Sequence, residues 1–372
     1  MKQKERAYYL DWLRIAVILL LVPFHSAITF ATRGDGFIRF PQHVPAMDVF
    51  LWFLSIWIMP TLFLVSGISS YYALQHRTPG QYAKERRTKL LIPLLAGFLL
   101  VCPPMSYLRA LFIGTFQGSL FQFYPQFFIK GTYPRGNLNW GHLWFLAYLY
   151  VFSMILLPLF IRLIKEPLKP RLKEASVILE KGLGVYLLPI PLMLSETFLR
   201  PHFPGLQNLV WDWANFILYL SLVFYGYLFA ANDRILDNIR NIRKFSLFLG
   251  VILFLAAFAS RLLGIAAYMK SIYPAYNALM VFAWVFAVLG YFNSLLNVKN
   301  RLYVYLNDAS FPVYIFHFLP ITVVAYFIAR SDLNVWLKWF IMIVVAYPTT
   351  FVLYELVRRI PFVRFIFGVK SR

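Results

Sequence analysis

Long apolar runs constrain this chain more than any other feature of its sequence. Stretches of about 20 apolar residues recur along the 372 residues, of which 60% are hydrophobic and 14% are charged. A soluble domain carries about 25% charged residues, whereas an apolar run of about 20 residues can span a bilayer as a helix. The sequence therefore predicts an all-α, polytopic membrane protein with a single transmembrane domain over residues 1–372.

We expect ten transmembrane helices, and the fifth is the weakest because it is short and contains Pro189 and Pro191. The expected spans cover residues 8–30, 48–74, 90–113, 142–164, 184–199, 211–231, 245–268, 274–296, 308–329 and 335–357. Of the 36 Lys and Arg residues, 25 fall in loops on the side of the amino terminus and eight on the other side. Positive loops stay in the cytoplasm, so both termini are expected there. The net charge of +21 then reflects topology rather than nucleic-acid binding.

The first span carries ionisable residues at membrane depth, where they are costly and indicate function. Arg14 and His25 are eleven residues apart, close to three helical turns, so both lie on one face. Asp11 can pair with Arg14 three residues later, and Pro23 frees a backbone carbonyl near His25. Two alternatives stay open: Arg14 as an anchor whose head reaches the interface, and His25 as a hydrogen-bonded core residue.

Three further polar residues interrupt apolar spans, and each has a simpler explanation beside the functional one. His142 opens the fourth span and is either a site residue or merely interfacial. His317 lies within the ninth span, where a single His is more often a hydrogen-bonded core group. Glu355 ends the tenth span and can pair with Arg359 at (i, i+4).

A small-residue element and a basic loop follow each other at the second span. Ser66 and Gly67 allow close helix packing. The next loop contains Arg77, Arg86 and Arg87, which mark a cytoplasmic segment and can also bind phosphate oxygens. Arginines at the cytoplasmic mouth would hold an anionic, phosphate-bearing donor.

The chemistry that fits this arrangement is acyl transfer with a histidine base. A His with a pKa near neutrality can remove a proton from a hydroxyl as it attacks an acyl carbon, a role that suits His25. No Ser-His-Asp motif or metal-ligand spacing such as HExxH competes, so no metal site is expected. A single cysteine, Cys102, excludes an internal disulfide.

Five ordered motifs resemble the acyltransferase 3 family of membrane acyltransferases over essentially the whole chain. They are YLDWLRIAVILLLVPFHS, FLVSGISSYY, KERRTKLLIP, GHLWFLAYLY and SFPVYIFHFLP, and the first carries the family's Arg-x10-His as Arg14 and His25. The closing stretch FVLYELVRRIPFVRFIFGVK is similar to the glucan biosynthesis protein C branch, which succinylates periplasmic glucans. One departure is that Pro320 follows His317 by three residues, where family members often have two.

The resemblance implies an acyl-CoA co-substrate, acetyl-CoA or succinyl-CoA, with no permanently bound cofactor. It also implies transfer to a hydroxyl of a periplasmic or cell-surface glycan, in the bacterial inner membrane. Under this hypothesis His25 is the base, Arg14 organises the site, and Glu355 and His317 join the catalytic set. The expected substrate-binding residues are Asp11, Ser66, Gly67, Arg77, Arg86, Arg87, His142 and Trp144.

Two other classes of function remain open from the sequence. A transporter or flippase of a small organic acid or lipid-linked sugar would also place polar groups on its spans. A degenerate acyltransferase acting as a sensor or scaffold is disfavoured by the intact Arg14 and His25.

Overall fold

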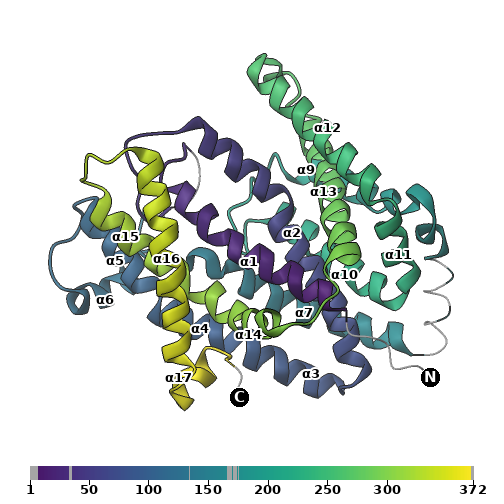
Figure 1. Cartoon of the computed structure of the whole chain (residues 1–372), viewed down its shortest axis with the longest axis horizontal. Helices are drawn as coiled ribbons and strands as arrows, with labels where there is room; N and C mark the ends of the chain where they lie inside the picture. Colours follow the sequence, from purple (N-terminus) through teal and green to yellow (C-terminus); the bar gives the residue numbers. More distant parts are fainter. Residues whose placement is uncertain are drawn as a thin grey trace. The chain divides into compact units, whose positions relative to one another are not determined.

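The computed structural model describes residues 7–32, 36–133, 135–165, 170, 174 and 176–369, and these residues are mostly helical (Figure 1). The first half contains α1 (Tyr8–Ile28), α2 (Pro45–Gln75), α3 (Pro79–Arg86), η1 (Arg87–Leu91), α4 (Ile92–Leu100), α5 (Cys102–Phe112), α6 (Leu120–Ile129), η2 (Gly141–Leu143), α7 (Trp144–Ile164), η3 (Val177–Glu180) and η4 (Gly182–Leu187). The second half contains α9 (Pro189–Leu199), α10 (Trp213–Ala231), α11 (Asp233–Asn241), α12 (Arg243–Leu262), η5 (Ile265–Ala267), α13 (Tyr273–Leu295), α14 (Arg301–Phe316), α15 (Phe318–Ile328), α16 (Val335–Val357) and α17 (Pro361–Ile366).

The expected all-α membrane fold is confirmed. Within the described residues, nine helical stretches are long and apolar enough to cross a membrane, and the number is ten if the bent pair α14 and α15 counts as one span. The third stretch begins earlier than expected, at Pro79, and runs to Phe112 through α3, η1, α4 and α5. The cytoplasmic placement of the termini stays a prediction.

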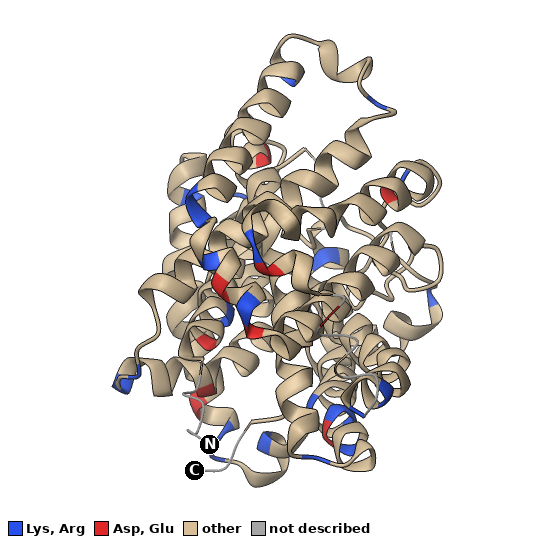
Figure 2. Cartoon of the chain, turned by 90° about the vertical axis from the view of Figure 1, so that its right-hand side faces the viewer, with Lys and Arg blue, Asp and Glu red and all other residues tan. Residues whose placement is uncertain are grey.

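The structure does not describe all of the Lys and Arg residues on which the expected topology depends. Nine of them lie outside the described residues: Lys2, Lys4, Arg6, Arg33, Lys169, Arg171, Lys173, Lys370 and Arg372. Figure 2 shows how sparsely charged residues are spread over the helices.

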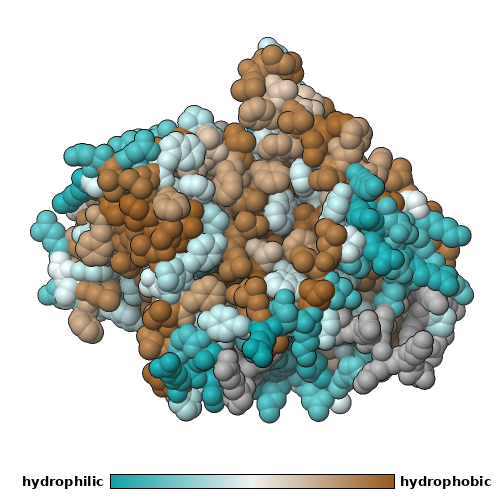
Figure 3. All heavy atoms as spheres, viewed as in Figure 1, coloured by the Kyte–Doolittle hydropathy of each residue, from teal (hydrophilic) through white to brown (hydrophobic). Residues whose placement is uncertain are grey.

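Two helices present apolar side chains outward along much of their length. Only 17% of the apolar stretch of α12 and 28% of that of α16 is buried inside the protein. Phe248 and Leu255 are exposed on α12, and Phe340 and Val352 are exposed on α16. Apolar residues accordingly cover broad areas in Figure 3, as expected for surfaces in contact with lipid.

The chain forms two compact units, and the first comprises residues 1–14, 55–85 and 148–299. Within it α13 packs against α9, α11 and α12. A close backbone approach joins α2 to α10. A Cβ on Gly67 would lie 1.9 Å from the carbonyl oxygen of Val223, and a Cβ on Gly226 would lie 1.9 Å from that of Leu64. Only glycine permits this spacing, which explains the small residue at Gly67.

The second unit comprises residues 15–54, 86–147 and 300–372. Here α16 packs against α14 and α15, and α15 packs against α5. The ninth span is broken rather than continuous, because α14 and α15 meet at an angle of 50°. His317 is the residue between them, and Pro320 lies in the first turn of α15. Proline has no N–H to donate, so it cannot continue the hydrogen-bond ladder of α14.

Candidate active site

Three histidines from three separate elements of the second unit lie together. They are His25 on α1, His142 on η2 and His317 at the break between α14 and α15. The ring centroid of His317 lies 4.9 Å from that of His142 and 5.1 Å from that of His25, while His25 and His142 are 6.2 Å apart. Phe318 stacks on His25 at 4.2 Å. The structure therefore brings together three histidines that the sequence separates widely.

The helix break explains how two of the rings are held. When a helix ends, its last carbonyls lose their backbone donors and need other partners. Nδ1 of His317 lies 2.8 Å from the carbonyl oxygen of Tyr314, and Nε2 of His142 lies 2.9 Å from that of Ile315. The imidazole rings thus pair with the carbonyls that the helix break leaves without backbone donors. Inside a membrane such backbone groups must find their partners within the protein.

Each of the three rings also has a buried nitrogen without a hydrogen-bond partner. These atoms are Nδ1 of His25, Nδ1 of His142 and Nε2 of His317. His142 and His317 are 5% and 0% exposed, and His25 is half-buried. An unsatisfied buried polar group costs about 1–3 kcal/mol, so three in one place indicate a site that binds a hydrogen-bonding group. His142 is thus buried inside the protein, and its role at the site stays a prediction.

Two side chains of α16 donate hydrogen bonds to backbone carbonyls of α1 near Pro23, and these bonds hold the part of α1 that carries His25. Proline cannot donate to the carbonyl of Leu19, four residues earlier, and the hydroxyl of Tyr347 on α16 donates to that oxygen at 2.7 Å. The indole of Trp339 donates to the carbonyl of Pro23 itself at 3.2 Å. The expectation that Pro23 frees a carbonyl is confirmed, and α16 supplies the donor.

A tight turn places His142 at the start of α7. Gly141 has a φ of +50°, which disfavours side-chain-bearing residues, and its N–H donates to Oδ1 of Asn139 at 2.7 Å. A Cβ at Gly141 would meet the ring of Phe37 at 3.3 Å. The hydroxyl of Tyr314 donates to the carbonyl of His142, so this backbone is held from both sides.

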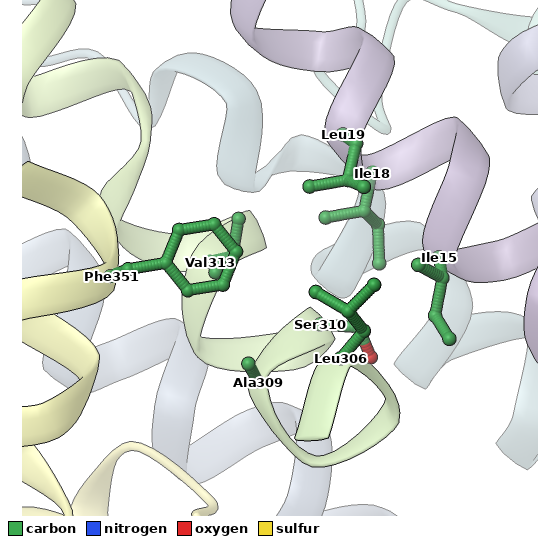
Figure 4. A pocket seen from close by; sticks show the side chains of 8 residues that line it. All are labelled: Ile15, Ile18, Leu19, Leu306, Ala309, Ser310, Val313 and Phe351. Carbon is green, nitrogen blue, oxygen red and sulfur yellow. The ribbon is translucent and has the colours of Figure 1, made fainter. Parts of the chain in front are cut away.

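An apolar pocket lies along the same helices, toward the beginning of α1 and α14 (Figure 4). The space among its lining atoms is about 170 Å³ and includes open solvent, so the pocket is open rather than enclosed. The lining side chains come from α1, α14 and α16: Ile15, Ile18, Leu19, Leu306, Ala309, Ser310, Val313 and Phe351. Val313 precedes His317 by one turn and Ile18 precedes His25 by about two turns, so the pocket starts within about 10 Å of the histidines.

Two of the other expected catalytic residues form local ion pairs. Arg14 pairs with Asp11 at 3.0 Å, as expected from their spacing on α1. Glu355 pairs with Arg358 at 2.8 Å, so the expected partner Arg359 is wrong by one residue. Three residues rather than four separate the pair, a spacing that a helix also brings onto one face. Their catalytic roles stay predictions.

The expected binding residues of the first unit have structural partners. Arg77 pairs with Glu85 at 2.9 Å and links the end of α2 to α3. The hydroxyl of Ser66 donates to the carbonyl of Leu62 at 2.7 Å, and Gly67 makes the close contact with α10. Whether these residues also contact a substrate stays a prediction.

Arg86 and Arg87 stand where the third stretch changes helix type. Arg86 is half-buried and ends α3, while Arg87 is exposed and begins the π-helical turn η1. The N–H of Ile92 donates to the carbonyl of Arg87, five residues earlier. Such turns are rare and occur often at functional sites. Trp144, the remaining expected binding residue, is buried at the start of α7.

Sequence reasoning missed several residues around the histidines. Tyr314 lies one turn before His317, and Phe318 follows it directly, so the motif SFPVYIFHFLP contained both. Tyr347 was not detectable, because its role depends on where α16 packs. In the part of the chain that the structure describes, no group of three or more His, Cys, Asp or Glu residues could hold a metal ion.

A buried polar cluster in the first unit was also missed. Asp212 accepts hydrogen bonds from the hydroxyl of Tyr148 and from the N–H of Gln207. Burial raises the pKa of Asp212. Nearby, the guanidinium of Arg200 forks onto both oxygens of Glu196 at 2.7 Å. These contacts tie the loop before α10 to α7 and α9, which is a structural role.

Comparisons with known proteins agree with the motifs. The model of a family described as "Acyltransferase domain" matches residues 7–355. The chain is 23% identical to Glucans biosynthesis protein C of Escherichia coli O1:K1 / APEC over 386 residues, covering 98% of this chain and 95% of the relative. The same figures hold for that protein from Escherichia coli O45:K1 (strain S88 / ExPEC) and from strain UTI89 / UPEC. No solved structure matches significantly.

Proposed function

Because the chain belongs to the acyltransferase 3 family of membrane proteins, we propose that it moves an acyl group from cytoplasmic acyl-CoA to a hydroxyl of an extracytoplasmic glycan or glycolipid. The proposed location is a bacterial inner membrane, crossed about ten times. The observation that carries the proposal is the cluster of His25, His142 and His317, with three buried ring nitrogens left without partners. The name of the relatives makes glucans the first acceptor to test.

The chemistry assigns His25 the role of general base. An acceptor hydroxyl attacks the thioester carbonyl carbon, a carbon–oxygen bond forms, and the carbon–sulfur bond breaks. His25 takes the hydroxyl proton, which later leaves with the thiolate as the free thiol of CoA. A positioned histidine contributes about 10²–10⁴-fold to such a transfer. A route through an acyl-enzyme intermediate would need the same base in its final step.

The decisive experiment reconstitutes the purified protein in liposomes with labelled acetyl-CoA or succinyl-CoA and candidate glycans. Base-labile label on the glycan together with stoichiometric release of CoA is the expected result. Uptake of an organic acid or a lipid-linked sugar, with no CoA release from any donor, would favour the transporter instead.

The basic turn formed by the half-buried Arg86 and the exposed Arg87 is the proposed contact for the donor's phosphates. Guanidinium groups match phosphate oxygens geometrically, and hydrogen bonds to charged groups contribute about 1.5–3 kcal/mol each. We predict that Arg86→Ala or Arg87→Ala raises the KM for acyl-CoA about tenfold or more and leaves kcat within about twofold. Steady-state kinetics with varied acyl-CoA measures both constants.

The matched control for these variants is Arg39→Ala, which removes an exposed arginine from a loop predicted to lie on the other side of the membrane. It should leave the KM for acyl-CoA unchanged. If the KM for acyl-CoA rose equally in Arg39→Ala, or did not rise in Arg86→Ala and Arg87→Ala, these arginines would determine membrane topology only and would not bind the donor.

The apolar pocket is the proposed space for the acyl group or the adjoining arm of the donor. Its lining is apolar except for Ser310, whose hydroxyl donates to the carbonyl of Asn307. We predict that Leu306→Trp fills the pocket and lowers kcat/KM about tenfold or more for donors with longer acyl chains, but less than about threefold for acetyl-CoA. Competing donors of increasing chain length give the ratio directly.

Leu302→Trp is the control, because Leu302 lies one turn earlier on α14, is 57% exposed and does not line the pocket. A similar loss in both variants would show that bulk on α14, rather than space in the pocket, determines the effect.

A further inference from the structure

Two of the three histidines have their protonation pattern set by the broken helix. A carbonyl oxygen only accepts hydrogen bonds, so a ring nitrogen beside it must carry the hydrogen. Nδ1 of His317 lies 2.8 Å from the carbonyl oxygen of Tyr314 and 3.2 Å from that of Val313. Nε2 of His142 lies 2.9 Å from the carbonyl oxygen of Ile315. Neutral His317 therefore presents a lone pair on Nε2, and neutral His142 presents one on Nδ1.

Both lone pairs are buried and have no donor. Nδ1 of His25 is buried beside them, also without a partner. If His25 carries its hydrogen on Nδ1, that hydrogen has an acceptor within the cluster, and Nε2 is left unprotonated. His317 is the nearer of the two acceptors, since its ring centroid is 5.1 Å from that of His25, compared with 6.2 Å for His142.

We propose that His317 is a positioning residue for His25. In the substrate complex, Nδ1–H of His25 donates to Nε2 of His317, a bond that these two atoms do not make in the structure without substrate. Nδ1–H of His317 donates to the carbonyl of Tyr314. This chain of hydrogen bonds keeps Nε2 of His25 free to take the hydroxyl proton. The proposal rests on the proposed function, in which His25 is that base. Hydrogen bonds of this kind are often long in the absence of substrate and shorten in the complex.

The helix break gives this arrangement an electrostatic reason. The carbonyl end of a helix carries partial negative charge. The carbonyls of Val313 and Tyr314 face His317, so the end of α14 stabilises the positive charge that His25 gains with the proton. The carbonyl of Val313 also accepts the backbone N–H of His317. A continuous ninth span would use the carbonyl of Tyr314 in its own ladder as well, and His317 would have no fixed tautomer.

Amide substitutions at position 317 separate positioning from a merely structural role. Asn places its amide near Nδ1 of the imidazole, so His317→Asn can keep the bond to Tyr314 but is too short to reach His25. His317→Gln places its amide oxygen near Nε2 and can accept from His25. We expect His317→Leu and His317→Asn to lower kcat about 100-fold while the KM for acyl-CoA stays within about twofold, and His317→Gln to recover about tenfold or more of the loss.

Thermal unfolding in detergent checks that each variant is folded. If His317→Leu is not folded, the comparison uses only His317→Gln and His317→Asn. Equal kcat values for the Gln and Asn variants, or a kcat for His317→Asn near that of the wild type, would overturn the positioning role. Wild-type protein without any transfer activity would instead overturn the proposed function. An active wild type and an inactive His25→Ala keep the two outcomes distinct.

Discussion

His25→Ala is expected to abolish acyl transfer, with a fall in kcat of about 10³-fold or more. The variant removes the proposed base, while the site keeps His142, His317 and the apolar pocket, so substrates still bind. General base catalysis contributes about 10²–10⁴-fold. The other lone pairs of the cluster, on Nδ1 of His142 and Nε2 of His317, belong to buried atoms, whereas His25 is half-buried. Transfer of labelled acyl groups by purified protein at saturating donor measures the effect.

The matched control is His43→Ala, which removes an exposed histidine from the same unit. It should retain wild-type kcat, which shows that the preparation and assay tolerate loss of an imidazole. His25→Ala should unfold within a few degrees of the wild type. Wild-type transfer by a folded His25→Ala protein would remove the general base from the mechanism.

Gly67→Ala is expected to lower the free energy of unfolding by about 3 kcal/mol or more, a large loss for the addition of one methyl group. Its Cβ would lie 1.9 Å from the carbonyl oxygen of Val223, and backbone atoms cannot turn aside as a flexible side chain can. The helices α2 and α10 must therefore separate. Gly226→Ala should have a similar effect, because its Cβ would lie 1.9 Å from the carbonyl of Leu64.

Thermal unfolding followed by size exclusion in detergent measures both variants. The double variant should lose less than the sum of the two, since one separation of the helices relieves both clashes. Gly80→Ala is the control: nothing lies within 4 Å of its added Cβ. If Gly67→Ala were as stable as Gly80→Ala, the close contact of α2 and α10 would be wrong.

The functional residues differ in how far local sequence could identify them. The pairing of Asp11 with Arg14 follows from helical spacing alone, and the structure has it at 3.0 Å. Glu355 also pairs within its own turn, but the choice of Arg358 over Arg359 depends on side-chain packing around the end of α16. The local sequence thus predicts that Glu355 forms an ion pair, but it does not decide between Arg358 and Arg359 as the partner.

The ninth span shows more clearly what the local sequence cannot predict. Pro320 indicates a weakened ladder, yet neither the 50° bend nor the partners of the open carbonyls can be derived from it. One partner, His142, is 173 residues from the carbonyl of Ile315 that accepts its hydrogen bond. A single His in an apolar helix therefore looked ordinary at His317, and only the fold shows two more beside it.

The sequence by itself determined that this chain crosses a membrane about ten times, that α1 carries Arg14 and His25, and that Pro23 leaves a carbonyl open. These are local properties, because the length of an apolar run, the period of a helix and the missing N–H of proline depend on neighbouring residues only. The tertiary structure alone decided which distant side chains pair with the carbonyls left without backbone donors. Tyr347 donates to the carbonyl of Leu19, and two histidines pair with carbonyls at the end of α14. In lipid each freed backbone group must find a protein partner, and the packing of helices far apart in the chain selects it.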